Sequence, residues 1–163
     1  MPKMNTSSQK VLKITHLFFV CLWVGGAITL ALLKLGVHPD NGSALHGFDL
    51  TRTFIDDFIV IPGAVGCLLT GLVYSIFTGF GFFKLRWVAV KWVITIAGIL
   101  FGTFWLGPWL NSLPPLSKQL GMEALNNPAY NYAASMNFSW SLVQMSSILF
   151  AVVISVLKPW KNK

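Results

Sequence analysis

The chain has 163 residues, of which 55% are hydrophobic and only 10% are charged, whereas an ordinary soluble domain has about 25% charged residues. Its mean hydropathy is +0.66. These values exclude an ordinary soluble domain and predict an integral membrane protein, with the lipid bilayer as its first partner. The net charge of +7 does not indicate nucleic-acid binding, because the basic residues are sorted to one side of the apolar stretches.

Four apolar stretches are long enough to cross the ~30 Å hydrocarbon layer, which takes about 20 residues of helix. They cover roughly 14–36, 55–79, 87–110 and 135–157. Each is longer than the about 9 to 11 residues of a barrel strand, and none alternates apolar with polar residues. We therefore predict an all-α fold, a four-transmembrane-helix bundle in which residues 1–163 form a single transmembrane domain.

The basic residues predict the orientation of the bundle. Most of them precede the first span, follow the fourth, or lie between the second and third. On the other side there are only Lys34, Arg52 and Lys118. The positive-inside rule then places both termini in the cytoplasm. The first apolar run is also longer than the about 7 to 15 residues of a signal-peptide core, so we expect it to remain as an anchor.

The connections between the spans are unequal in length. The outer segments 37–54 and 111–134 contain "HPDNGS", "NSLPP" and "NNPAYN", which is composition typical of turns, so we predict long outer loops. Thr53 and Asp56 fit a capping box that would open the second span. The inner connection "GFGFFKLR" is short, which predicts that the second and third spans are antiparallel neighbours.

Apart from Lys34, Asp56 and Asp57 at the outer ends of their spans, two charged or polar ionisable residues, His16 and Lys91, fall inside predicted spans, where such residues are costly and are candidates for function. His16 follows Lys13 by three residues and Lys91 follows Arg86 by five, which places them about 4.5 Å and about 7.5 Å deeper than those flanking charges. Both spans start on the cytoplasmic side, so the two side chains share one layer. The alternatives are a snorkelling lysine and a histidine bonded to a backbone carbonyl.

The helical faces that carry these two residues suggest a cofactor. His16 shares its face with Val20, Trp23 and Ala27, and Lys91 shares its face with Thr95, Gly98 and Gly102. A neutral imidazole is a good iron ligand, and a buried cation pairs with carboxylates. Haem supplies both partners. A porphyrin would fit between two such faces, and so would ordinary packing of small residues.

Two further groups of polar residues stand out. In the fourth span Gln144, Ser147, Ala151 and Ser155 form a weakly polar stripe, which is typical of a bundle interior. The outer segment holds His38, Asp40, His46, Asp49, Asp56 and Asp57 within 20 residues. These residue types suit a divalent cation, and His38 with Asp40 is the candidate pair, although their spacing is not diagnostic.

Three pieces of sequence together resemble a known family. Trp23 follows His16 by seven residues and precedes Gly25-Gly26; "RWVAVK" places Trp87 four residues before Lys91; and the last apolar run ends in "LKPW". This ordered set resembles the HemJ-type bacterial protoporphyrinogen IX oxidases and their relatives of the copper-resistance D type. The resemblance implies a bacterial cytoplasmic (inner) membrane protein with haem b on His16, near Trp23, and with Lys91 needed for activity.

The family also carries an Asn-Glu pair near the start of the last span and an Arg late in the first, and these have no clear equivalents here. Lys34 and Gln144 lie near those places but out of register. The resemblance, together with the His16–Lys91 pair, implies haem binding, with a redox role resembling that of protoporphyrinogen oxidase and a porphyrin or quinone-type partner. The second axial ligand is open between none, Lys91 and a ligand from another subunit of a homo-oligomer. The alternatives are a membrane protein without a cofactor and a metal-handling or copper-transport accessory protein.

Overall fold

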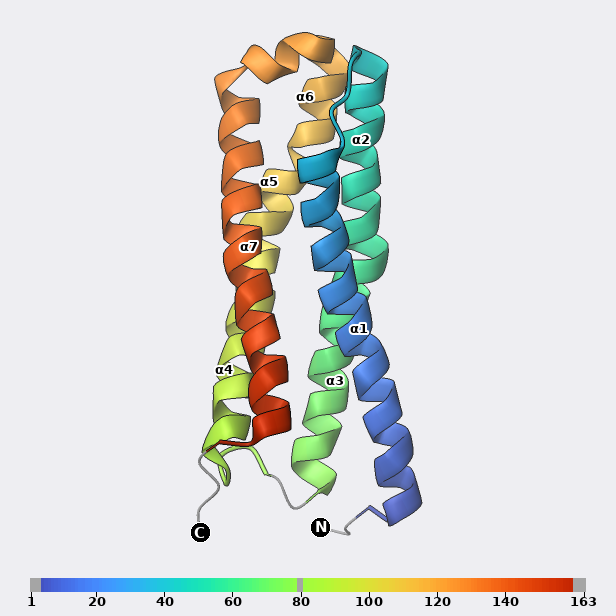
Figure 1. Cartoon of the computed structure of the whole chain (residues 1–163), viewed down its shortest axis with the longest axis vertical. Helices are drawn as coiled ribbons and strands as arrows, with labels where there is room; N and C mark the ends of the chain where they lie inside the picture. Colours follow the sequence, from blue (N-terminus) through green and yellow to red (C-terminus); the bar gives the residue numbers. More distant parts are fainter. Residues whose placement is uncertain (1–3, 79–80, 160–163) are drawn as a thin grey trace.

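The computed structural model describes residues 4–78 and 81–159, and within these ranges it contains helices and no strand. The helical segments in chain order are α1 (Thr6–Gly36), α2 (Gly42–Ile55), η1 (Asp56–Val60), α3 (Ile61–Phe77), α4 (Arg86–Phe101), η2 (Gly102–Leu106), α5 (Gly107–Asn111), α6 (Leu113–Leu120), η3 (Gly121–Asn126) and α7 (Pro128–Leu157). Because α2, η1 and α3 follow one another without a break, as do α4, η2 and α5, the bundle consists of four long columns (Figure 1).

All four columns are long and apolar enough to cross a membrane. Their outward surface is apolar as well: Phe18, Phe58 and Phe104 are 58%, 65% and 63% exposed. Large exposed apolar surface of this kind is rare on soluble monomers and is the normal surface of a helix in lipid. The prediction of an all-α integral membrane protein with four transmembrane helices is therefore confirmed.

The columns are longer than the predicted spans. Residues 37–54 and 111–134 were expected to be loops, yet α2 fills most of the first segment, and α6, η3 and the start of α7 fill most of the second. The 36-residue column Gly42–Phe77 corresponds to about 54 Å of helix, more than the ~40–45 Å of a whole bilayer. Residues 37–54 and 111–134 are thus mostly helical extensions of the bundle.

The turn-forming residues in these segments act as helix caps. The side chain of Asn41 accepts a hydrogen bond from the Ala44 N–H at the start of α2, and Asn127 caps α7 in the same way. The predicted capping box was wrong: the Thr53 hydroxyl donates to the Asp49 carbonyl inside the helix, at 3.2 Å. Since α2 already begins at Gly42, Thr53 lies inside a helix and does not cap the start of one.

Both central columns contain a π-helical turn shortly before a proline. The segment η1 precedes Pro62, and η2 precedes Pro108. Each π turn ends with an N–H bonded five residues back, from Ile61 to the Asp56 carbonyl and from Gly107 to Gly102. A proline has no N–H to give and its ring crowds the preceding turn, so a wider turn accommodates it. Such turns bend helices and are frequent at functional sites.

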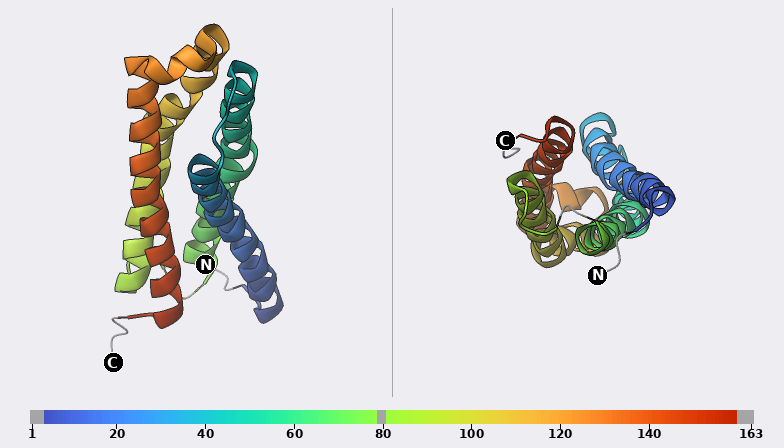
Figure 2. Two further views of the ribbon diagram at one scale, coloured as in Figure 1. Left: turned by 45° about the horizontal axis from the view of Figure 1, so that its top comes forward. Right: turned by 90° about the horizontal axis from the view of Figure 1, so that it is seen from below.

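The columns form two pairs. The first pair joins α1 to η1 and α3, and the second joins α7 to α4 and α5 (Figures 1 and 2). The α1–α3 contact is close because Gly63 faces the α1 backbone, where an added Cβ would lie 2.6 Å from the Trp23 nitrogen.

The bundle has two different ends. At one end α2, α6 and η3 meet the start of α7, around a core of Leu45, Leu110, Leu113, Ala124, Tyr130, Ala133 and Ala134. We call this the loop end. The first turn of α1 and the last turn of α7 lie at the opposite end, the terminal end (Figure 1). A second core of Trp23, Ala64, Cys67 and Ile148 lies between them.

Candidate functional site

His16 lies on α1, facing α3, and is half-buried. Its Nδ1 is 2.7 Å from the Thr70 hydroxyl oxygen, and that hydroxyl donates to the Gly66 carbonyl. Because a hydroxyl has one proton to donate, its bond to Gly66 requires that the imidazole Nδ1–H be the donor in the first bond. A neutral His16 is thereby held in the tautomer that leaves Nε2 as the nitrogen with a lone pair.

Lys91, on α4, lies close enough to His16 and to Cys67 for its charge to act on both. Its Nζ is 5.6 Å from the centroid of the Trp87 ring, within the range of a cation–π contact. The edge of the Tyr74 ring packs against His16, with centroids 5.9 Å apart. The structure therefore brings the two ionisable residues singled out from the sequence into one region, from opposite helix pairs.

A cavity of about 460 Å³ separates the two pairs nearer the middle of the bundle. It is lined by Trp23 and Ala27 of α1 and by Gly98 and Gly102 of the third column, which are the faces predicted to meet. Trp23 is only 4% exposed. His16 and Lys91 are not among the residues that line this cavity, so the predicted pair and the predicted faces do not form a single enclosed pocket.

The loop-end side of this cavity carries a buried polar cluster that was not predicted. The Tyr130 hydroxyl lies 3.2 and 3.1 Å from the two carboxylate oxygens of Asp49 and donates to that carboxylate. Arg52 Nη2 donates to Asn137 Oδ1 at 3.1 Å, and Asn137 Nδ2 donates to the Leu106 carbonyl at 3.0 Å. We call Asp49, Arg52, Tyr130 and Asn137 the Arg52 cluster; it connects α2 to α7 and to the end of η2.

Arg52 is the least satisfied member of the Arg52 cluster. It is 2% exposed and Asp49 is fully buried, but the nearest approach between their charged groups is 3.9 Å, from Nη1 to Oδ1. Within the described residues neither Nε nor Nη1 has a hydrogen-bond acceptor. The guanidinium also lies 5.5 Å from the Phe48 ring centroid. Each buried donor without an acceptor costs about 1–3 kcal/mol, and more for a charged group.

The outer residues considered as a metal site are dispersed. Asp40 accepts a hydrogen bond from the Asn41 side chain at 2.8 Å, the His46 ring donates to the Pro114 carbonyl at 3.1 Å, and Asp49 belongs to the Arg52 cluster. In residues 4–78 and 81–159 no group of three or more His, Cys, Asp or Glu side chains is arranged to hold a metal ion. Nothing in the described part of the chain therefore gives His38 and Asp40 a third ligand of these types.

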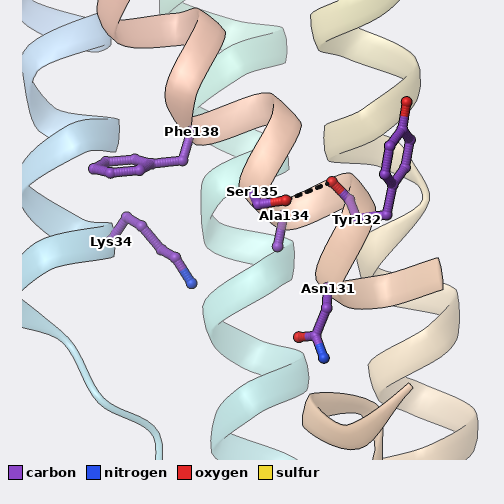
Figure 3. A pocket seen from close by; sticks show the side chains of 6 residues that line it. All are labelled: Lys34, Asn131, Tyr132, Ala134, Ser135 and Phe138. Atoms are coloured by element: carbon purple, nitrogen blue, oxygen red, sulfur yellow. Dashed lines mark hydrogen bonds between the residues drawn. The ribbon is translucent and has the colours of Figure 1, made fainter. Parts of the chain in front are cut away.

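An open groove of about 520 Å³ lies between α1 and α7 on the loop-end side. Figure 3 shows its lining: Lys34, Asn131, Tyr132, Ala134, Ser135 and Phe138. The Lys34 stem extends from α1 into the space beneath the Phe138 ring, which projects from α7 toward α1 (Figure 3). Phe138 also lines the central cavity, so one aromatic side chain lies between the two spaces.

No protein-family model matches this chain, and neither a curated protein nor a solved structure is similar to it.

Proposed function

We propose that this integral membrane protein binds haem b near its terminal end and has a redox role, with His16 as the axial iron ligand. The observation that supports this most directly is the His16–Thr70 hydrogen bond. Metal-binding histidines generally donate their second ring N–H to a fixed acceptor, which orients the ring and holds the tautomer. The Thr70 hydroxyl is such an acceptor, since its own proton is used on Gly66.

Lys91 and Trp23 are the other residues that would hold the group. The ammonium of Lys91 suits a propionate or a carboxylate of the substrate, because a partly buried cation gains most from a charge-assisted hydrogen bond. Trp23 offers a buried aromatic face. A haem iron bound here would supply one-electron chemistry with a porphyrin or quinone-type partner. His16 would provide the nitrogen that binds the iron, and Lys91 would bind a carboxylate.

The proposal is tested by the absorption spectrum of the purified protein after expression with added haem precursor. We expect a Soret band that is lost or shifted in His16→Ala and altered in Lys91→Gln. His38→Ala is the matched control, because it removes a histidine near the other end of the bundle and should leave the spectrum unchanged. Gel filtration in detergent verifies that each variant folds.

Two results would count against this function. Wild-type protein that stays colourless when haem is supplied would indicate a membrane protein in which His16 and Lys91 serve packing alone. A Soret band unaffected by His16→Ala in a folded variant would assign the iron to another ligand. Orientation in the bacterial inner membrane, with both termini in the cytoplasm, belongs to the same proposal and is measured by cysteine labelling from either side.

A further inference from the structure

We propose that the cavity beside Arg52 is a binding site for a molecule with a single carboxylate on an apolar body. This site differs from the proposed haem site in position, ligand and charge, and the two share only Trp23. The carboxylate would accept from one of the unpaired groups of Arg52, Nε or Nη1, while the apolar body would occupy the space between the two helix pairs.

The unpaired donors of Arg52 suit an acidic ligand. Nε and Nη1 carry three of the five N–H groups of a guanidinium, and they lie on a side chain that is 2% exposed and lines the cavity. In the low-dielectric interior of a membrane bundle a buried donor needs an acceptor, and an oxygen of a ligand in the cavity would supply one. A carboxylate is the acceptor that bonds most strongly to a guanidinium.

The charges around Arg52 limit the charge that a ligand can carry. Asp49 is engaged by the Tyr130 hydroxyl, and its carboxylate comes no nearer to the guanidinium than 3.9 Å. Asp56 lines the same cavity, whereas Lys34 is close enough to act on both Asp49 and Arg52. Asp49 and Asp56 already balance the charges of Lys34 and Arg52, so each further negative charge is unfavourable and a dianion is disfavoured more strongly than a monoanion. One carboxylate is therefore the smallest charge that still bonds to the unpaired guanidinium donors.

The cavity has the size and lining of a small-molecule pocket. At about 460 Å³ it falls within the range of about 300–1,000 Å³ that is typical of small-molecule pockets. Its walls away from Arg52 are mainly apolar, with Trp23, Leu30, Ala64 and Ile148 among them. This volume suits one acyl chain or a compact ring system, and a phospholipid with two long chains would have to leave them outside.

A second unsatisfied group lies at the far side of the cavity. Gln144 Oε1 is buried and has no donor among the described residues. Gln144 follows Asn137 by seven residues on α7, which places it about 10 Å along the helix from the residue that holds Arg52. A hydroxyl or N–H in the body of the ligand would satisfy Gln144, so the cavity offers donors at one end and an acceptor at the other.

The groove between α1 and α7 provides a path to this site. Lys34 lies in the groove, and Phe138 lines both the groove and the cavity (Figure 3). An amphipathic acid in the outer part of the bilayer would meet the Lys34 ammonium first and would reach Arg52 when the Phe138 ring turns aside. Both cations therefore lie on one path from the bundle surface to the cavity.

The test uses radiolabelled dodecanoic acid and the full chain in a neutral detergent. We expect saturable binding at one molecule per chain, with methyl dodecanoate binding roughly 10- to 100-fold more weakly because it lacks the charge. Asp49→Asn combined with Arg52→Gln removes the guanidinium without leaving a buried carboxylate unpaired, and it should weaken dodecanoate binding by a similar factor. Lys118→Gln, on the exposed face of α6, should have no effect.

A second variant keeps the test decisive if the double variant does not fold. Gly102→Leu should fill the cavity and abolish binding while Arg52 stays intact, because an added Cβ there meets only the Gln144 Nε2 atom, at 3.8 Å. Gly25→Leu is its control, since nothing lies within 4 Å of an added Cβ at that position.

The proposal is overturned by equal binding of acid and ester, by undiminished binding in a folded double variant, or by no measurable binding of dodecanoate to the wild-type chain. Saturable binding of phosphatidylglycerol in place of dodecanoate would show that a lipid phosphate is the ligand, and the carboxylate assignment would then be wrong. Loss of dodecanoate binding with an intact Soret band, or the reverse, separates this site from the haem proposal.

Discussion

The two ends of the bundle differ in how their polar side chains are buried and partnered. At the terminal end, His16 is bonded to Thr70 and Lys91 lies beside the Trp87 ring, so each polar group has a local partner and each side chain remains partly accessible. In the Arg52 cluster, by contrast, Asp49 and Arg52 are almost completely buried. That burial requires partners from several helices, and the set of partners is incomplete.

This difference indicates which polar region contributes more to folding. Separating the residues of the Arg52 cluster would expose a carboxylate and a guanidinium to a low-dielectric interior, whereas moving Lys91 lets its stem carry the ammonium to the membrane surface. The cluster also bridges the two helix pairs, through Arg52 of α2 and Asn137 of α7. We therefore expect the loop end to hold the pairs together and the terminal end to tolerate substitution.

The largest effect is expected from Arg52→Leu, which leaves the Asp49 carboxylate buried with no cation beside it on α2. Removing one partner of a buried pair typically costs about 3–5 kcal/mol of folding free energy. Lys91→Leu at the terminal end should cost less than about 1 kcal/mol, as for a weakly coupled charge. Unfolding in mixed detergent micelles, followed by circular dichroism, measures both.

The double variant with Asp49→Asn and Arg52→Gln sharpens this comparison. It keeps hydrogen-bonding groups in place and removes both charges, so it should recover most of the stability that Arg52→Leu loses. If Lys91→Leu proved as destabilising as Arg52→Leu, the proposed difference between the two ends would be wrong.

The sequence indicates the polar residues of the terminal end more clearly than those of the loop end, for a physical reason. His16 and Lys91 are charged or polar residues isolated in long apolar runs, so they stand out in a hydropathy profile. Arg52 lies among the turn-forming and acidic residues of 37–54 and was therefore counted as a loop charge on the outer side. Its burial depends on Asn137 and Tyr130, which are 85 and 78 residues away, and no local pattern indicates such a contact.

One local signal in the sequence does indicate the helix that carries Arg52. Asp49 and Arg52 are three residues apart, which is the spacing of neighbours on one helical face, and Leu45 precedes them by one further turn. Asn41 has the side chain of a helix cap. Together these residues indicate a helix over 42–55, and a helix in that segment carries its charges into the bundle.

A second substitution tests whether close packing of α1 on α3 supports the middle of the bundle as the Arg52 cluster supports the loop end. Gly63→Ala places a Cβ 2.6 Å from the Trp23 backbone nitrogen and 3.0 Å from its Cα, and neither backbone atom can move without shifting α1. We expect a loss of about 1–3 kcal/mol, as for overpacked cores. Unfolding in mixed micelles measures it.

Gly25→Ala provides the matched control on α1. Nothing lies within 4 Å of a Cβ added there, and alanine favours a helix over glycine by up to about 1 kcal/mol. The control should therefore be neutral or slightly stabilising. Equal losses for the two variants would mean that Gly63 does not set the α1–α3 distance, and the middle of the bundle would then depend on other contacts.

Thr70→Val should have a small effect on folding and a large effect on function. Valine has nearly the same shape and removes the hydroxyl that accepts from His16 Nδ1, so stability should fall by only about 0.5–1.5 kcal/mol. If His16 binds iron, however, losing the group that fixes its tautomer should weaken haem binding by about 10- to 100-fold, measured by haem titration at the Soret band. Thr70→Ser keeps the hydroxyl and should restore binding. A spectrum identical in Thr70→Val and wild type would leave His16 as a packing residue at the end of the bundle that tolerates change.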